Sequence, residues 1–382
     1  MKPLRKDELA QAKILLRAPN WIGDAVMCLP ALRALRRALP EADLVVAARP
    51  WVLDLFSGDS LRMRTVAYDT RGAHGGVVGR WRIAAELRPE KFDAAILFQN
   101  AFDAALLAVL AGIPIRAGYA RHGRRWLLTH PVPVPPPGET PRHEAHYYLE
   151  LLRRVGLLES YSEVREISLP VTGFARTKAR ARLSELLSAK VAAPIESKPL
   201  VGISPGAAFG TAKRWPAERF AALALRLSRD LGAVPVFFGS KEEAPLAESL
   251  LPKTGGAAAS LAGKTSLGDF MSLIPGCDLY ISNDTGAMHV AAAFGVPTLA
   301  LFGPTDEQAT RPLGSRVHLL VGQAECRPCL LRHCPIDHRC MNSVSVEEVF
   351  EAARSLLAAS QPERPKETGK NACPTWQEGI AR

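Results

Sequence analysis

The stretch ISNDTGAMHVAAAFGVPTLALFGP, residues 281–304, determines the fold that we predict for this chain. It begins at the end of an apolar run at 279–282, continues into a helix-like segment near 286–295, and returns to an apolar run at 298–302. Strand, helix and strand in this order are typical of a parallel sheet whose crossovers are helical. We therefore predict an α/β unit here.

The turn between the first strand and the helix has the composition of an anion site. Asn283, Asp284 or Thr285 can cap the helix through a side-chain oxygen, and Gly286 lets a phosphate approach closely. Free backbone amides at the helix start attract anions. His289 follows Thr285 by four residues and so lies on the same face of the helix, where it can join these amides around a pyrophosphate. We predict a nucleotide-diphosphate site; the alternative is a capped helix with a packed histidine.

The same alternation of apolar runs and helix-like segments recurs in the rest of the chain and indicates two parallel sheets. In the first half, apolar runs that precede predicted helices lie at 14–18, 44–48, 64–68 and 92–98. In the second half, predicted strands lie at 200–204, 234–239, 279–282 and 298–302, with helices near 216–231, 241–251, 266–274 and 286–295. Two such halves suggest facing sheets with a ligand between them.

The length of 382 residues suits two domains. We place them at 1–180 and 181–360, the second including a Cys-rich loop at 323–342, and expect residues 361–382 to be a disordered tail. Between the two sets of strands we predict a proline-rich surface loop at 131–141, a helix near 143–156, a strand near 164–169 and an interdomain connection within 170–199.

Charge and hydropathy restrict the function classes. The net charge of +10 favours acidic partners such as nucleic acid, anionic lipid or a phosphorylated substrate. Basic residues are dispersed without a recognition motif, which argues against nucleic acid. The first twenty residues lack the uninterrupted apolar core of a signal peptide, and the apolar run at 104–115 is too short for a membrane span, so we expect a cytoplasmic protein.

A second candidate motif is GISPGAAFGTAKRWPAERFAAL, 202–223. A strand enters a glycine-containing loop with Thr211 and Lys213, and a helix opened by Pro216 follows. A loop cation at the mouth of a strand is suited to neutralising a leaving diphosphate. The alternative is a solvated surface lysine.

A third motif, RAPNWIGDAVMCLPALRAL at 17–35, places Asp24 where the first strand turns into a helix. A carboxylate at this edge of a sheet can take a proton from an acceptor hydroxyl. The alternative is that Asp24 only caps the helix. We expect Pro30 to kink or restart that helix.

Other nucleotide motifs are incomplete. The segment LAGKTS, 261–266, lacks the first glycine of a P-loop because Ala258 stands there. No GxGxxG follows a predicted strand and no Asp-x-Asp pair occurs, which weakens the dinucleotide and metal-dependent alternatives.

Four cysteines, Cys326, Cys329, Cys334 and Cys340, fall within fifteen residues. In a cytoplasmic chain such a group favours metal over disulfides. Their spacing matches no familiar zinc finger, so structural zinc, a reduced surface loop and a redox or cluster role all stay open.

The segment GYARHGRRW, 118–126, is basic and aromatic. Arg121, Arg124 and Arg125 can receive an anionic acceptor near a membrane surface. The alternative is a solvated surface loop.

Together, RAPNWIGDAVMCLPAL, SPGAAFGTAKRWP, SNDTGAMHVAAAFGVP and LFGPT, in this order, resemble the ADP-heptose:lipopolysaccharide heptosyltransferases, glycosyltransferase family 9, above all the heptosyltransferase II type. The resemblance runs from about residue 13 to 358. It implies a GT-B fold, two facing Rossmann-like domains, with the acceptor on the first and the nucleotide sugar on the second. It also implies an inverting transfer of heptose from ADP-heptose to a lipid-A-linked core acceptor, transiently at the inner membrane, with no metal required.

The resemblance also implies roles for single residues. Asp24 would be the general base, with Asn20 lining the same turn, and Lys213 would face the pyrophosphate. Glu242 or Glu243 would bind the ribose. The remaining residues expected on the ADP-sugar are Thr211, Asp284, Thr285, Gly286 and His289.

Two other functions fit the same fold. A nucleotide-sugar epimerase shares two facing domains and needs no acceptor. A non-catalytic saccharide- or nucleotide-binding protein would bind several nucleotide sugars without turning them over.

Overall fold

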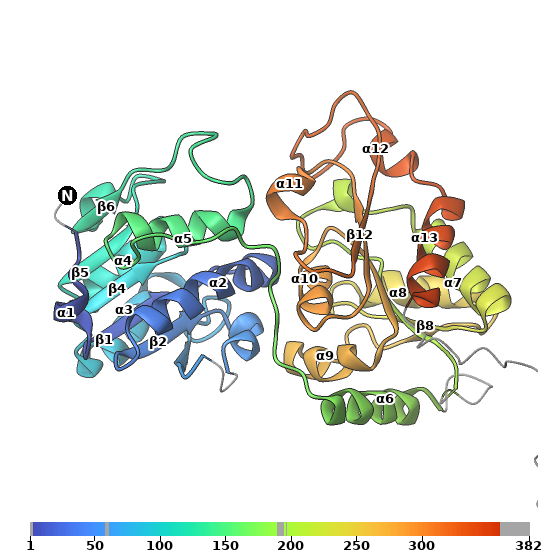
Figure 1. Ribbon diagram of the computed structural model, residues 1–382, viewed down its shortest axis with the longest axis horizontal. Coiled ribbons are helices and arrows are strands. Elements are labelled where there is room, and N and C mark those ends of the chain that lie inside the picture. The colour runs from blue at the N-terminus through green and yellow to red at the C-terminus, as the bar shows by residue number, and fades with distance from the viewer. Residues whose placement is uncertain (1–2, 58–60, 189–194, 196, 360–382) are drawn as a thin grey trace, which may run out of the picture.

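A computed structural model describes residues 3–57, 61–188, 195 and 197–359. It contains two six-stranded sheets, ordered β3-β2-β1-β4-β5-β6 and β12-β11-β10-β7-β8-β9. Every strand pairing in both sheets is parallel. The sheets lie in two lobes side by side (Figure 1). The predicted α/β architecture with two parallel sheets is therefore confirmed.

The first lobe alternates strands and helices along the chain. Its strands are β1 (Lys13–Arg17), β2 (Asp43–Ala48), β3 (Arg64–Ala67), β4 (Ala94–Leu97), β5 (Ile115–Tyr119) and β6 (His130–Val132). Its helices are α1 (Lys6–Leu9), α2 (Ile22–Ala38), α3 (Gly76–Leu87), α4 (Phe102–Leu110) and α5 (Glu144–Arg154), with short 3-10 helices η1 (Pro50–Leu55), η2 (Arg88–Glu90) and η3 (Arg125–Leu127).

The second lobe repeats the pattern. Its strands are β7 (Leu200–Ser204), β8 (Val234–Phe237), β9 (Ala259–Ser260), β10 (Leu279–Asn283), β11 (Thr298–Phe302) and β12 (Val317–Val321). Its helices are α6 (Gly173–Ser188), α7 (Ala217–Leu231), α8 (Ala244–Leu250), α9 (Leu267–Leu273), α10 (Gly286–Ala293), α11 (Glu307–Thr310), α12 (Arg339–Asn342) and α13 (Val346–Ala358), with η4 (Thr211–Lys213), η5 (Leu251–Thr254) and η6 (Ile274–Gly276).

Helices cover both faces of the first sheet, which explains why its central strands are apolar throughout. One apolar cluster joins β1 and β4 to α2 and α5, and a separate cluster joins the opposite face to α3 and α4. The α2 cluster continues into Val290 and Ala291 of α10 in the second lobe. The lobes therefore meet through buried apolar side chains as well as through the chain itself.

The two central helices form the junction. α2 packs directly against α10 (Figure 1). A second contact joins η1 to α9. The strand order reverses between β1 and β4 in the first sheet and between β7 and β10 in the second, so α2 and α10 each follow a strand that borders such a point. In open α/β sheets, ligands bind outside the carboxyl ends of the strands at such points. The two predicted sites therefore face each other.

Most strand predictions are confirmed, with one exception and several omissions. Residues 164–169 form no strand; they run extended between the lobes, and the Ile167 and Leu169 amides donate to Leu313 and Ala293 of the second lobe. β5, β6, β9 and β12 were missed because their sequences are short or interrupted by polar residues and proline. Pro131 lies in the edge strand β6, within the loop predicted at 131–141. α2 passes through Pro30 without ending.

The division expected at residues 180 and 181 falls inside α6, and α6 packs on η6 and α9 of the second lobe. We propose that the boundary lies instead in the extended segment 159–172. Most of the segment 189–196 and the expected tail at 361–382 lie outside the described residues. Among the helices that the structure describes, none has both the length and the apolar character to cross a bilayer.

Candidate active site between the two lobes

Asp24 lies in the first turn of α2, half-buried at the junction. The N-cap position of this helix is Trp21, and no side chain caps it, so the interpretation of Asp24 as a cap is wrong. The turn before it is braced from the first lobe: Arg17 Nη2 donates to Asn20 Oδ1 at 2.6 Å, and Trp51 Nε1 donates to the Asn20 carbonyl at 2.9 Å. Asp24 therefore projects from a fixed turn.

Burial raises the pKa of the Asp24 carboxyl to about 6. The Lys213 ammonium lowers this pKa and the Asp284 carboxylate raises it, so both groups of the second lobe act on Asp24 across the junction. A carboxyl with a pKa in this range is largely ionised at neutral pH and is still basic enough to accept a proton efficiently.

Lys213 and Asp284 form a buried ion pair. Lys213 Nζ lies 2.6 Å from Asp284 Oδ2, and Thr305 Oγ1 donates to the same oxygen at 2.6 Å. The ammonium also lies 4.8 Å from the centre of the Phe209 ring. The structure thus brings together the lysine and aspartate predicted on the donor side, and adds Thr305 from the LFGPT segment.

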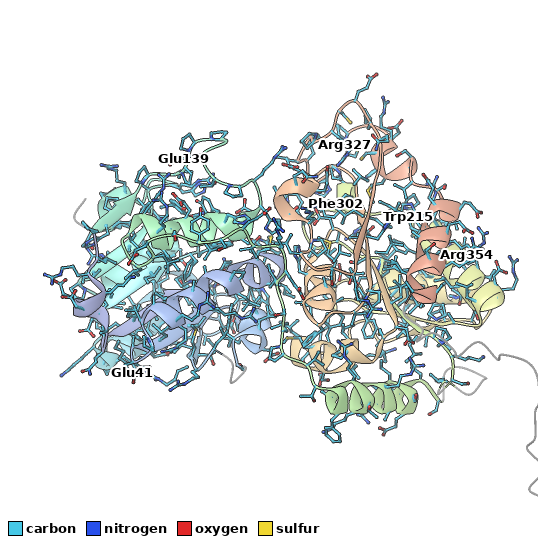
Figure 2. All side chains as sticks on the ribbon, in the orientation of Figure 1. Glu41, Glu139, Trp215, Phe302, Arg327 and Arg354 are labelled. Carbon is cyan, nitrogen blue, oxygen red and sulfur yellow. The ribbon has the colours of Figure 1, made fainter. Side chains whose placement is uncertain are left out.

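Asn283 holds the loop that carries Lys213. Its Nδ2 donates to the carbonyls of Pro205 and Gly206, and its Oδ1 accepts from the Trp215 amide at 3.1 Å. Trp215, which is buried, also donates from Nε1 to Val344. Trp215 and Phe302 both lie inside the second lobe (Figure 2). The loop is anchored at its base, and Lys213 is positioned from there.

The start of α10 differs from the prediction in its cap. Thr285 occupies the N-cap position, but no side-chain oxygen accepts from the helix amides. The Thr285 hydroxyl instead lies 3.1 Å from that of Ser282, and the Asp284 carboxylate is committed to Lys213. The expected side-chain cap is therefore wrong, and the first amides of α10 have no side-chain acceptor.

Gly286 and Gly23 are needed for the contact between the two helices. A Cβ added at Gly286 would lie 2.6 Å from Ile22 Cβ, and one added at Gly23 would lie 3.1 Å from His289 Cδ2. The absent side chain of Gly286 therefore makes room for α2, where we had expected it to make room for phosphate. Burial, with smaller contributions from His143 and Lys213, lowers the pKa of His289 to about 3, so this histidine is a neutral group.

Of the two glutamates after β8, Glu243 is the one that lies over the site loop. Its Oε2 accepts from the Ser240 amide at 2.9 Å, and a Cβ added at Gly206 would lie 2.1 Å from its Oε1. Glu242, by contrast, is exposed. Spacing alone could not choose between two adjacent acids.

The three arginines of the first lobe do not share one environment. Arg124 is fully buried, and its guanidinium donates to the Tyr119, Gln99 and Ala101 carbonyls and to Asn100 Oδ1. These hydrogen bonds join the loop after β4 to the loop after β5. Because Arg124 is buried, its side chain cannot contact an acceptor directly. Arg121 and Arg125, by contrast, are exposed.

An acidic residue that sequence reasoning missed lies beside Asp24. Glu144 opens α5, which packs along α2, and burial raises the pKa of Glu144 to about 7, with a further rise from Asp24 and a decrease from Arg121. One turn later, Tyr147 accepts from Asn100 Nδ2 at 3.0 Å and stacks on Tyr119. No motif in the segment marked Glu144, because its proximity to Asp24 arises from helix packing.

The Cys-rich loop braces the donor site. Arg327, at the edge of the second lobe (Figure 2), donates to the Thr305 carbonyl at 3.0 Å, and His333 Nδ1 lies 3.1 Å from Thr211 Oγ1. The cysteines at 326, 329, 334 and 340 are free thiols. Within the described part of the chain, no three His, Cys, Asp or Glu side chains are grouped closely enough to hold a metal ion. Structural zinc, a reduced surface loop and a redox or cluster role therefore all stay untested for these four cysteines.

Comparison with known proteins identifies the family. Residues 80–339 match the model of glycosyltransferase family 9 (heptosyltransferase). Lipopolysaccharide heptosyltransferase 2 of Salmonella typhimurium is 30% identical over 357 residues, covering 91% of this chain and 99% of that protein. Lipooligosaccharide heptosyltransferase 2 of Haemophilus influenzae is 31% identical over 318 residues, covering 80% of this chain and 88% of that protein.

A solved structure agrees with the sequence relatives. The ADP-heptose lipopolysaccharide heptosyltransferase II of E. coli superposes with a TM-score of 0.74 at 27% identity, covering 91% of this chain and 99% of that one. The GT-B architecture expected from the resemblance is thereby confirmed. From the family match and these relatives, the chain is a glycosyltransferase and belongs to glycosyltransferase family 9, the heptosyltransferases.

Proposed function

We propose that this enzyme transfers L-glycero-D-manno-heptose from ADP-heptose to the inner core of lipopolysaccharide, with inversion at the anomeric carbon. The observation that carries the proposal is the placement of Asp24, with its pKa raised to about 6, opposite the Lys213–Asp284 pair of the other lobe. The relatives named for heptose transfer to lipopolysaccharide support the choice of donor and acceptor.

In the reaction that we propose, a hydroxyl of the core heptose attacks the anomeric carbon of the donor. Asp24 accepts the hydroxyl proton while the bond from the anomeric carbon to the diphosphate oxygen breaks. ADP leaves with its bonding electron pair, and the charge that accumulates on it is met by Lys213 and by the free amides of α10. The scheme uses side chains and backbone only, and no cofactor is required.

On the donor side, we assign the ribose to Glu243 in place of Glu242, because Glu243 lies against Gly206 of the site loop. Thr211, Thr285 and His289 border the same loop and helix start and remain our candidates for contacts to the ADP-sugar. His289 would act through an N–H donor, since its low pKa removes the charged form at neutral pH.

On the acceptor side, we propose Asn20, Arg121 and Arg125 as the residues that meet the anionic core, with Arg124 holding their loops in place. The enzyme would work in the cytoplasm and bind the inner membrane transiently, because the core is attached to lipid A. Structural zinc in the Cys-rich loop stays a prediction, and elemental analysis of the purified protein under reducing conditions would check it.

Product analysis tests the proposed function. The enzyme is incubated with ADP-heptose and with lipid-A-linked core acceptors of increasing length, and the products are identified by mass spectrometry. We expect the acceptor to gain one heptose and ADP to be released in equal amount. A changed nucleotide sugar formed without any acceptor would indicate an epimerase, and binding of several nucleotide sugars without turnover would indicate a non-catalytic protein.

A further inference from the structure

One face of the first lobe exposes large apolar side chains that no other part of the described chain covers. Val77 is 70% exposed, Val78 73% and Trp81 51%, all on α3. Beside them, Phe102 at the start of α4 is 40% exposed and Trp126 in η3 is 73% exposed. We call these five residues the α3–α4 face.

The five residues belong to one surface. α3 packs on α4, and α4 packs on η3, while Arg80 of α3 forms an ion pair with Asp103 of α4. The rings of Phe102 and Trp126 are 6.0 Å apart. A contiguous exposed apolar patch is unusual on a monomeric protein and indicates a binding partner.

The α3–α4 face lies at the acceptor edge of the sheet. All five residues lie in the first two turns of elements that follow the carboxyl ends of strands, or in the loop region after β5. The turn that carries Asn20 and the loop that carries Asn100 leave β1 and β4 at this same edge. Their helices cover the side of the sheet opposite to α2 and α5, so the face adjoins the acceptor opening without blocking the junction.

The charge around the face is positive. The exposed Arg82 lies on α3 beside Trp81, the Arg88 guanidinium lies 5.8 Å from the centre of the Trp81 ring, and the exposed Arg125 directly precedes Trp126. The nearest carboxylate, Asp103, is occupied by Arg80 and by the Tyr68 hydroxyl, which leaves Glu86, farther along α3, as the exposed acid of that helix. Tryptophan and aliphatic side chains surrounded by arginine match the boundary of a bilayer that contains anionic lipid.

We infer that the α3–α4 face docks on an anionic lipid bilayer, with Val77, Val78, Trp81 and Trp126 inserted at the headgroup boundary. The inference rests on the proposed function in one respect, that the acceptor is lipid-linked. Docking through this face would present the acceptor opening to a substrate that projects from the same membrane. It would also keep the second lobe, which carries the donor site, free to move.

Vesicle binding tests the inference. We compare the wild-type enzyme with V77S/V78S/W81S and W126S in co-sedimentation with vesicles of phosphatidylethanolamine and phosphatidylglycerol, and with vesicles of phosphatidylcholine alone. The triple variant should bind the anionic vesicles at least about tenfold more weakly, because partition scales with the apolar area inserted. Wild-type binding should weaken with salt and be poor on phosphatidylcholine.

The matched control is F174S, since Phe174 is 80% exposed on α6 of the second lobe and should not contribute. Far-UV circular dichroism and thermal unfolding confirm that each variant is folded. Wild-type binding by the triple variant, or an equal loss in F174S, would overturn the inference. So would a conversion from dimer to monomer in sedimentation equilibrium with vesicle binding unchanged, since the face would then bind a second copy.

Turnover separates this inference from the proposed function. The triple variant should transfer heptose to a soluble, lipid-free core oligosaccharide at the wild-type rate, and about tenfold more slowly to an acceptor embedded in vesicles, in line with its weaker partition. If the wild-type enzyme transfers heptose to neither acceptor, the proposed function fails, while vesicle binding still decides whether the α3–α4 face docks on lipid.

Discussion

The first turns of α2 and α10 share one local structure and place their aspartates in different environments. Each helix follows a central strand of a parallel sheet, and neither has a side-chain cap. Asp24 lies within the first turn of α2, and Asp284 lies just before α10. The two turns meet at the junction, where Gly286 contacts Ile22.

The difference lies in the partners of the two carboxylates. Asp284 is paired with Lys213 and accepts from Thr305, whereas Asp24 takes part in no ion pair among the described residues, and burial raises its pKa. Two carboxylates in similar positions are thereby suited to two tasks, proton transfer and the positioning of a cation. Environment, more than position on the fold, assigns the role.

The largest expected effect comes from removing the unpaired carboxylate. In Asp24→Asn the proton acceptor is lost while shape is kept, so kcat should fall by about 10² to 10⁴. ADP affinity, measured by calorimetry, should stay within a factor of about two, because Lys213 and α10 are untouched. Asp43→Asn, on an exposed strand end, serves as the control. Turnover of Asp24→Asn at the wild-type rate would remove Asp24 from the proton-transfer role.

The second prediction concerns loss of the ion pair between Lys213 and Asp284. Lys213→Met leaves Asp284 buried without its cation, which should lower the free energy of unfolding by about 3 to 5 kcal/mol. Adding Asp284→Asn to that variant should recover part of the loss, because the uncompensated charge is gone. Denaturant unfolding of both single variants and the double variant measures the coupling. Strict additivity of the two single effects would show that the pair contributes nothing to stability.

The third prediction concerns the effect of the Asp24 carboxyl on the stability of the folded protein at different pH values. Asp24 ionises near pH 3.8 when unfolded and near 6 when folded, so the folded state binds more protons between these values. The contribution of Asp24 to the stability of the folded protein therefore falls as pH rises from about 4 to about 6 and stays lower above that range. Asp24→Asn escapes this fall and should be more stable at pH 7 by about 2 to 3 kcal/mol.

Unfolding of this variant and of the wild-type protein is compared at pH 4 and pH 7. The advantage of Asp24→Asn should be present at pH 7 and largely absent at pH 4. An advantage of equal size at both pH values would contradict the raised pKa of Asp24.

The sequence predicted the strands that line the site and the residues at their ends, because buried parallel strands and the turns after them have strong local patterns. It could not predict partners that come from distant segments. Lys213 was expected to face the diphosphate and Asp284 to hold the ADP-sugar, and only folding shows that the two side chains bind each other. Glu144 approaches Asp24 through helix packing alone.

Predictions were wrong where the local sequence pattern did not reflect the contacts that a segment makes in the folded chain. Residues 164–169 were predicted as a strand, but they cross between the lobes, and the Ile167 and Leu169 amides donate to single carbonyls of the second lobe. Arg124 lies in a basic run that resembles solvated surface, yet its guanidinium is buried against three carbonyls and Asn100. Burial of a charged side chain depends on acceptors that the local sequence does not reveal.

The smallest expected effect comes from changing Glu144, the neighbour of Asp24. The pH profile of kcat/KM should rise with an apparent pKa near 6, as Asp24 loses its proton. Glu144, whose pKa lies near 7, is mostly protonated at that point, so Glu144→Gln should move the rising limb to lower pH by less than about one pH unit. Initial rates across pH 5 to 8 in one buffer series measure the limb, with Glu159→Gln, on the exposed end after α5, as the control. Since removing a neighbouring acid can only ease the ionisation of Asp24, a limb displaced to higher pH would show that Glu144 acts on the reaction in another way.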